Sequence, residues 1–105
     1  MIVTRTPYRL SLFGGGTDYN AWFESNGGLV LGCAMKHYCY ISIRRLPPFF
    51  SEYKTRVVYS AVELVKNNEE IKHPSIRGCL DYLNIKEGVE IHHQGDLPSR
   101  SGIGS

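Results

Sequence analysis

Hydrophobic and polar residues alternate along several stretches of the chain, which is the pattern of a strand with one buried face. The alternation is clearest at residues 38–45, where Cys39, Ile41 and Ile43 share one side. Pro7 lies inside another such stretch and indicates an edge position or a break, because proline cannot donate a hydrogen bond to a neighbouring strand. The predicted strands are residues 2–13, 29–35, 38–45, 55–59 and 89–94, with 55–59 as the hairpin partner of 38–45.

The stretch between the last two predicted strands has helical signals. Ser60 and Glu63 have the spacing of a capping box, which predicts a helix that starts there and weakens near residue 67. Pro74 is well placed at a first helical position and predicts that the helix restarts. After it, one apolar helix face is expected to pack on a sheet: Ile76, Cys79, Leu80 and Leu83. One further helical turn is expected at residues 21–24.

The order of these elements predicts an α+β fold with a mixed or antiparallel sheet and helices on one face. A length of 105 residues allows at most one domain, with a core of moderate stability. The apolar content of 42% is that of an ordinary globular protein. We therefore expect a folded chain rather than a disordered one.

Charge and composition narrow the classes of partner. The formal net charge is +2 and the basic residues are scattered, so neither a nucleic acid nor an anionic membrane surface is an expected partner. The chain opens with a strand-like segment rather than a signal peptide, and it has no apolar run of about 18 residues. These features predict a cytoplasmic location and no membrane contact.

Several residues that can bind metals or partners are expected to be structural. Cys33, Cys39 and Cys79 include no C-x-x-C pair and are predicted to be buried free thiols without a metal or redox role. His92 and His93 are adjacent on a predicted strand, so they point to opposite faces and cannot bind one metal together. An aromatic cluster is expected to pack over an open end of the sheet, the alternative being a partner or ligand surface: Phe49, Phe50 and Tyr53.

Two glycine-rich stretches are the candidates for chemistry. Gly14–Gly16 is costly in backbone entropy, which suggests that something needs bare backbone there, the alternative being a tight turn. Residues 95–105 follow a predicted strand and end in Gly-Ile-Gly-Ser. A glycine-rich turn that leads into a helix is a natural anion site, the alternative being an ordinary surface loop. The stretch is neither a Walker A loop nor a dinucleotide fingerprint.

The two stretches together resemble the GHMP small-molecule kinases. Arg5-x-Pro7-x-Arg9-Leu-Ser-Leu-Phe-Gly-Gly-Gly-Thr-Asp18-Tyr19 resembles the first motif of that superfamily, and Pro98-x-x-x-Gly102-Ile-Gly-Ser105 resembles the opening of its ATP phosphate loop. Gly27-Gly28-Leu-Val-Leu resembles the strand that follows the first motif in sugar kinases. Galactokinase-like members have Gly-Glu-His-Thr-Asp-Tyr at the first motif, whereas the version here is similar to that of bacterial D-glycero-D-manno-heptose 7-phosphate kinases and some fucokinase-like proteins.

The resemblance implies a ribosomal protein S5 domain 2-like fold and phosphoryl transfer from ATP, with Mg²⁺, to a sugar hydroxyl. The acceptor that it implies first is the anomeric hydroxyl of heptose 7-phosphate. Arg9 would be catalytic, close to the acceptor hydroxyl and the transferred phosphoryl group. The residues implied to bind the sugar are Gly14, Gly15, Gly16, Thr17, Asp18 and Tyr19. The residues implied to bind ATP are Pro98, Ser101, Gly102, Ile103, Gly104 and Ser105.

The resemblance also implies that residues 1–105 are an incomplete N-terminal kinase domain that ends inside the phosphate motif, and that this chain alone is inactive. The expected partners are a sugar phosphate and ATP, and unpaired strand edges would favour a homo-oligomer. One alternative is a sugar kinase for galactose or fucose. Another is a non-catalytic binding or interaction module of the same fold.

Overall fold

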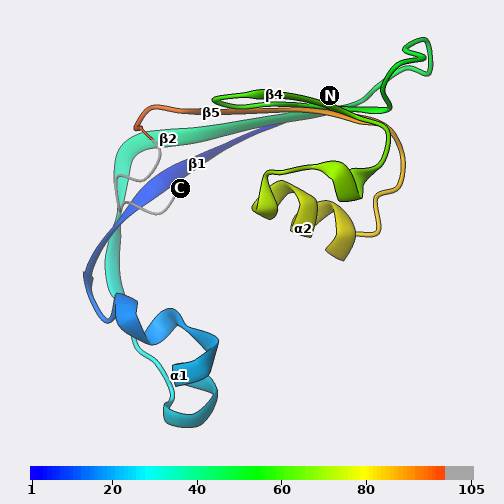
Figure 1. Ribbon diagram of the computed structural model, residues 1–105. Coiled ribbons are helices and arrows are strands. Elements are labelled where there is room, and N and C mark those ends of the chain that lie inside the picture. The colour runs from blue at the N-terminus through cyan, green and yellow to red at the C-terminus, as the bar shows by residue number, and fades with distance from the viewer. Residues whose placement is uncertain (99–105) are drawn as a thin grey trace. The chain divides into compact units, whose positions relative to one another are not determined.

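The computed structural model describes residues 1–98 (Figure 1). The chain forms two compact units, one of residues 1–4 with 40–94 and one that includes residues 5–39 with 95–98. The strands are β1 Ile2–Phe13, β2 Leu31–Arg45, β3 Thr55–Val58, β4 Val62–Val65 and β5 Val89–Gly95. The helices are α1 Asn20–Asn26 and α2 Pro74–Tyr82, with short 3-10 turns η1 Gly15–Asp18 and η2 Asn68–Glu70.

The sheet is mixed, as the sequence predicted. Its strand order is β1-β2-β5-β3-β4, so that β1, which contains Pro7, lies at an edge. Strand β3 pairs antiparallel with β4, where Val57 faces Glu63, and parallel with β5, where Val57 faces Ile91. The predicted strands 29–35 and 38–45 form one long strand, β2. The predicted hairpin of 55–59 with 38–45 is wrong, because β5 lies between β2 and β3.

The predicted helix at residues 60–67 is also wrong. The chain instead turns tightly after Tyr59, whose amide donates a hydrogen bond to the Ala61 carbonyl oxygen at 2.9 Å. It then returns as β4. Glu63 does not serve as a cap residue: its carboxylate accepts hydrogen bonds from the Tyr59 hydroxyl and the Lys72 amide. Pairing with β3 along all four residues of this short edge strand outweighs the local capping signal.

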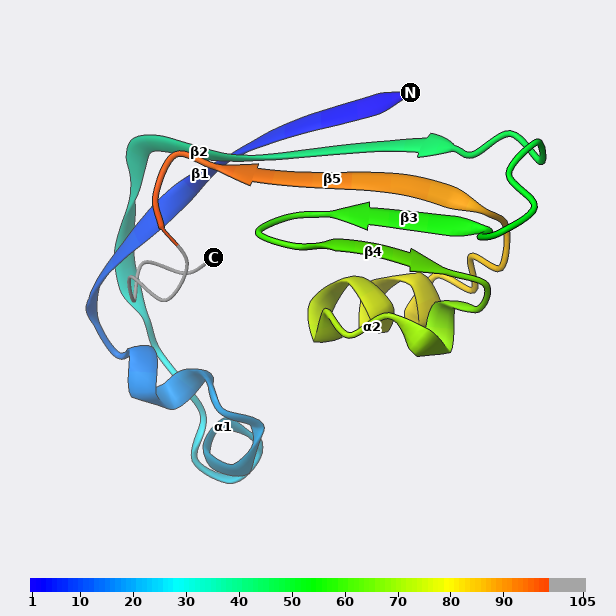
Figure 2. The same ribbon diagram turned by 45° about the horizontal axis from the view of Figure 1, so that its top comes forward.

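The core of the first unit lies between the sheet and α2, which covers one face in the views of Figures 1 and 2. Its buried residues are Val57, Val65, Ile71, Leu80, Val89 and Ile91. Helix α2 begins at Pro74, as predicted, and is capped by His73, whose Nδ1 accepts a hydrogen bond from the Ile76 amide. The predicted apolar helix face is too wide, because Cys79 and Leu83 are exposed.

Two other expectations about burial are wrong. Cys33 and Cys79 are exposed and Cys39 is half-buried, although all three are free thiols as predicted. In the connection after β2, Phe49 is 88% exposed, so the aromatic cluster does not pack as one group over the sheet. Only Phe50 and Tyr53 stack, with ring centroids 5.3 Å apart. Both errors have one cause: apolar character in a sequence favours burial but does not say which neighbours are present.

Candidate functional site

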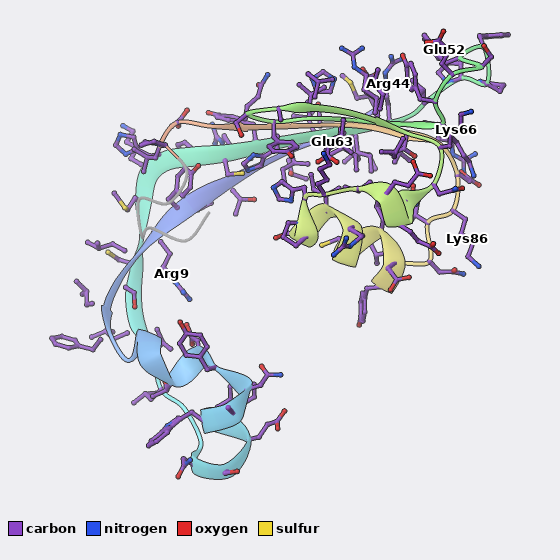
Figure 3. All side chains as sticks on the ribbon, in the orientation of Figure 1. Arg9, Arg44, Glu52, Glu63, Lys66 and Lys86 are labelled. Carbon is purple, nitrogen blue, oxygen red and sulfur yellow. The ribbon has the colours of Figure 1, made fainter. Side chains whose placement is uncertain are left out.

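Arg9 and Asp18, the two charged residues of the first motif, meet in the second unit. Arg9 projects from β1 (Figure 3), and its Nη2 lies 3.4 Å from Oδ2 of Asp18, the last residue of η1. The two side chains are 55% and 44% exposed, so solvent and small ligands can reach both. Gly32 on β2 approaches β1 closely, since a Cβ there would lie 3.0 Å from the Leu10 carbonyl oxygen and in ordinary contact, at 3.4 Å, with Arg9 Cγ and Cδ. No pattern in the sequence indicated this close approach at Gly32.

The turn between these two residues depends on Gly14. Its φ of +85° is in the left-handed region, and a Cβ on it would lie 1.9 Å from the carbonyl oxygen of Leu29. Thr17 completes the turn: its amide and its hydroxyl lie 2.9 Å and 2.7 Å from the Gly14 carbonyl oxygen. Gly14 and Thr17 therefore hold the loop in shape, and both are only partly exposed.

The remaining residues predicted to bind the sugar are exposed. Gly16 has no atom within 4 Å of where its Cβ would be, and its φ is not left-handed, so the fold itself does not require glycine there. A Cβ at Gly15 would meet only the Ser11 hydroxyl, at 3.3 Å. Tyr19 is 72% exposed. Gly15 and Gly16 thus leave open backbone beside the Arg9–Asp18 pair, which is where a ligand can approach the chain most closely.

The second motif begins at the end of β5, within the same unit. Asp96 is held there by Tyr38 of β2: the Asp96 amide donates to the Tyr38 carbonyl at 3.0 Å, and the Tyr38 amide donates to Asp96 Oδ2 at 2.7 Å. Pro98 is exposed. The other residues predicted to bind ATP lie outside the described part of the chain: Ser101, Gly102, Ile103, Gly104 and Ser105.

A buried carboxylate organises charges on the sheet of the first unit. Glu90 of β5 is 6% exposed and accepts a hydrogen bond from Nε of Arg44 of β2, labelled in Figure 3, while Nη1 of Arg56 of β3 lies 3.3 Å from Glu90 Oε1. His92, whose Nε2 is 3.1 Å from Glu90 Oε1, is the main cause that lowers the pKa of Glu90, with Arg44 adding to it against the effect of burial. Because Glu90 is the one carboxylate of this cluster and basic side chains of β2, β3 and β5 surround it, we interpret the cluster as a cross-strand interaction that stabilises the sheet.

The two adjacent histidines, which we predicted to be structural, have different neighbours. His92 contacts Glu90, whereas the His93 ring lies 6.3 Å from that of His73, the cap of α2. Within residues 1–98 no three His, Cys, Asp or Glu side chains are grouped so that they could hold a metal ion. None of the helices described is long and apolar enough to cross a membrane.

The first unit also has a shallow hollow of about 880 Å³ that the sequence did not indicate. Four cationic side chains belong to its lining, together with the acidic Glu69 and Asp81. One of these cationic groups already has a partner within the fold, because Lys54 Nζ donates a hydrogen bond to the Lys86 carbonyl oxygen at 2.5 Å. The basic residues of the lining are Lys54, Lys66, Arg77 and Lys86, of which Lys66 and Lys86 are labelled in Figure 3.

Comparisons relate the chain to kinases of heptose phosphates. A D-glycero-alpha-D-manno-heptose 7-phosphate kinase of Campylobacter jejuni is 29% identical over 111 residues, which cover 98% of this chain and 33% of that protein. A solved D-glycero-D-manno-heptose 1-phosphate kinase of B. thetaiotaomicron has a TM-score of 0.65 at 19% identity, over 96% of this chain and 36% of that one. No protein-family model matches the chain.

The chain resembles the N-terminal part of a heptose phosphate kinase. This confirms the resemblance predicted from the motifs and, through the solved structure, the α+β fold class. The chain spans about a third of the length of the proteins that it matches. The motif resemblance did not indicate the roles of Asp96, Tyr38 and Gly32. Each of these residues contacts a partner that is distant in sequence.

Proposed function

We propose that this chain is the N-terminal, incomplete part of a GHMP-type kinase that transfers a phosphoryl group from ATP to a sugar phosphate. The acceptor that we propose is D-glycero-D-manno-heptose 7-phosphate, at its anomeric hydroxyl. The observation that carries the proposal is the exposed Arg9–Asp18 pair beside the bare backbone of Gly15 and Gly16. The relatives, both named as heptose phosphate kinases, support the substrate class.

In this proposal each exposed residue has a task that fits its chemistry. The carboxylate of Asp18 accepts hydrogen bonds from sugar hydroxyls, and its ion pair with Arg9 fixes the direction of both side chains. The Arg9 guanidinium, close to the acceptor hydroxyl, would offset negative charge on the phosphoryl oxygens, which is the main requirement of phosphoryl transfer. Tyr19, which is exposed, offers an aromatic face and a hydroxyl to the sugar.

The nucleotide half of the proposal rests on the second motif. Pro98, Ser101, Gly102, Ile103, Gly104 and Ser105 would surround the ATP phosphates. Mg²⁺ bound to those phosphates would neutralise part of their charge, and we assign it no protein ligand among residues 1–98. Because the relatives are about three times longer, we propose that the 105-residue chain has no kinase activity alone and binds ATP weakly.

The bare backbone at Gly15 is proposed to select a phosphorylated sugar. Galactokinase-like proteins have glutamate at this place in the motif, and a carboxylate there would repel a phosphate dianion. Since a Cβ at Gly15 meets only the Ser11 hydroxyl, the fold should tolerate a longer side chain. We expect Gly15→Glu to weaken binding of heptose 7-phosphate about tenfold or more relative to Gly15→Gln, which has the same size without the charge.

Calorimetric titration of heptose 7-phosphate into the purified chain tests the acceptor site directly. We expect binding that is lost in Asp18→Ala and kept in Glu24→Ala, which removes a charge from an exposed position of α1 in the same unit. Equal affinity of Asp18→Ala and the unchanged chain would refute the role of Asp18. Tighter binding of an unphosphorylated hexose would refute the proposed acceptor, and turnover of ATP by the purified chain would refute its proposed inactivity.

A further inference from the structure

Asp96 holds the chain at the point where β5 ends and the second motif begins. Its amide donates to the Tyr38 carbonyl at 3.0 Å, and its Oδ2 accepts from the Tyr38 amide at 2.7 Å. Two residues paired in a sheet in this way normally exchange both bonds through their backbones. Here the carboxylate takes the place of a backbone carbonyl. The chain can therefore turn away from the sheet after Gly95 while the Tyr38 amide keeps its acceptor.

Close packing beside Asp96, as well as its charge, shapes this contact. A Cβ on Gly95 would lie 2.3 Å from the Tyr8 hydroxyl oxygen, so this position accepts only glycine while Tyr8 stays in place. Tyr8 is 2% exposed, and its pKa is raised first by that burial and then by Cys39 and the carboxylate of Asp96. The Arg5 guanidinium lies over the Tyr38 ring, 4.6 Å from its centre.

The residues in this arrangement come from three separate stretches of the second unit. Arg5 and Tyr8 belong to β1, Tyr38 to β2, and Gly95 and Asp96 to the end of β5 and the bend after it. Arg5 is also part of the first motif, so one side chain of that motif supports the start of the second. A bond from an amide to a carboxylate is charge-assisted and stronger than a neutral one, which makes Asp96 the residue on which the arrangement depends most.

We propose that Asp96 is a positioning residue for the nucleotide-binding segment that begins at Pro98. This inference rests on the proposed function, since it assumes that the segment binds ATP phosphates. The physical reason concerns how many molecules are ready to bind. Binding requires one particular direction of the backbone before Pro98, and only a fraction of the molecules has that direction. A ligand that binds only that fraction has its apparent affinity reduced in the same proportion. Asp96 keeps the fraction high by fixing residues 95–97 to Tyr38.

The first experiment measures the hydrogen bond without any ligand. Hydrogen exchange followed by NMR should show the Tyr38 amide exchanging about tenfold faster or more in Asp96→Ala than in the unchanged chain. Asp96→Asn keeps an acceptor oxygen and should retain most of the protection. Fluorescence of Trp22, the chain's single tryptophan and part of the same unit, checks that each variant is folded. Unchanged exchange at Tyr38 in Asp96→Ala would overturn the inference.

The second experiment titrates Mg²⁺-ATP into the same chains, again by NMR, which detects weak binding. We expect about tenfold weaker binding in Asp96→Ala, recovery in Asp96→Asn, and no change in the charge control Glu24→Ala. If Asp96→Ala loses the protection of Tyr38 but binds Mg²⁺-ATP as well as the unchanged chain, the positioning role is overturned. If the unchanged chain binds no nucleotide, the proposed function fails for this segment and takes the inference with it, whatever the exchange data show.

Discussion

Gly14 and Gly16 stand two residues apart in one glycine run, yet they should respond in opposite ways to the same substitution. Gly14 has φ +85°, which costs an alanine about 1–2 kcal/mol. Its Cβ would also lie 1.9 Å from the Leu29 carbonyl oxygen, and the backbone shift needed to relieve such an overlap costs roughly another 1–3 kcal/mol. Alanine returns up to about 1 kcal/mol by restricting the unfolded chain.

We therefore expect Gly14→Ala to lower the free energy of unfolding by about 2–4 kcal/mol. Gly16→Ala meets no atom within 4 Å and has no left-handed φ, so only the effect on the unfolded chain remains. Its free energy of unfolding should be unchanged or higher by up to about 1 kcal/mol. The pair is well matched, because both changes add one methyl group to the same turn.

Urea unfolding followed by Trp22 fluorescence measures both variants. Trp22 is the single tryptophan and lies in α1, in the same compact unit as the glycine run, so its emission reports the unfolding of that unit. Equal unfolding midpoints for Gly14→Ala and Gly16→Ala would refute the argument from the turn geometry. A stable Gly16→Ala chain then allows a clean titration with heptose 7-phosphate, in which weaker binding would indicate that the sugar approaches the Gly16 backbone.

Three further predictions concern the first unit. Burial opposes ionisation of Glu63, but hydrogen bonds from the Lys72 amide and the Tyr59 hydroxyl outweigh it and lower its pKa below 4.5. The stability that Glu63 contributes should thus be complete above pH 4.5 and lost as the pH falls through the lowered value, so Glu63→Gln should flatten the acid side of a urea-unfolding profile. His73→Ala should cost about 1 kcal/mol in thermal unfolding through loss of the α2 cap, and His73→Asn should restore most of it, whereas equal losses would rule out capping. Glu90→Gln should cost about 1.5–3 kcal/mol in the same assay, and an unaltered midpoint would show that Arg44 and Arg56 do not depend on it.

The sequence by itself determined the elements whose signals are local. Strand β1 has the predicted bounds, because its residues favour an extended backbone and alternate in polarity after Pro7, and both are local signals. Pro74 marked the start of α2 for an equally local reason, since its fixed φ suits a first helical turn. The motif comparison likewise selected Arg9 and Asp18, which the structure brings to 3.4 Å.

Only the tertiary structure decided the features that depend on distant partners. The capping signal at Ser60 and Glu63 is overridden, because Val62–Val65 pairs with β3 as an antiparallel edge strand. Gly14 was recognised as unusual, but its necessity comes from the Leu29 carbonyl, which the return of the chain brings against it. Asp96 finds its partner in Tyr38, 58 residues earlier in the chain. Such pairings are set by which strands lie side by side, and alternation along one strand specifies its faces but not its neighbours.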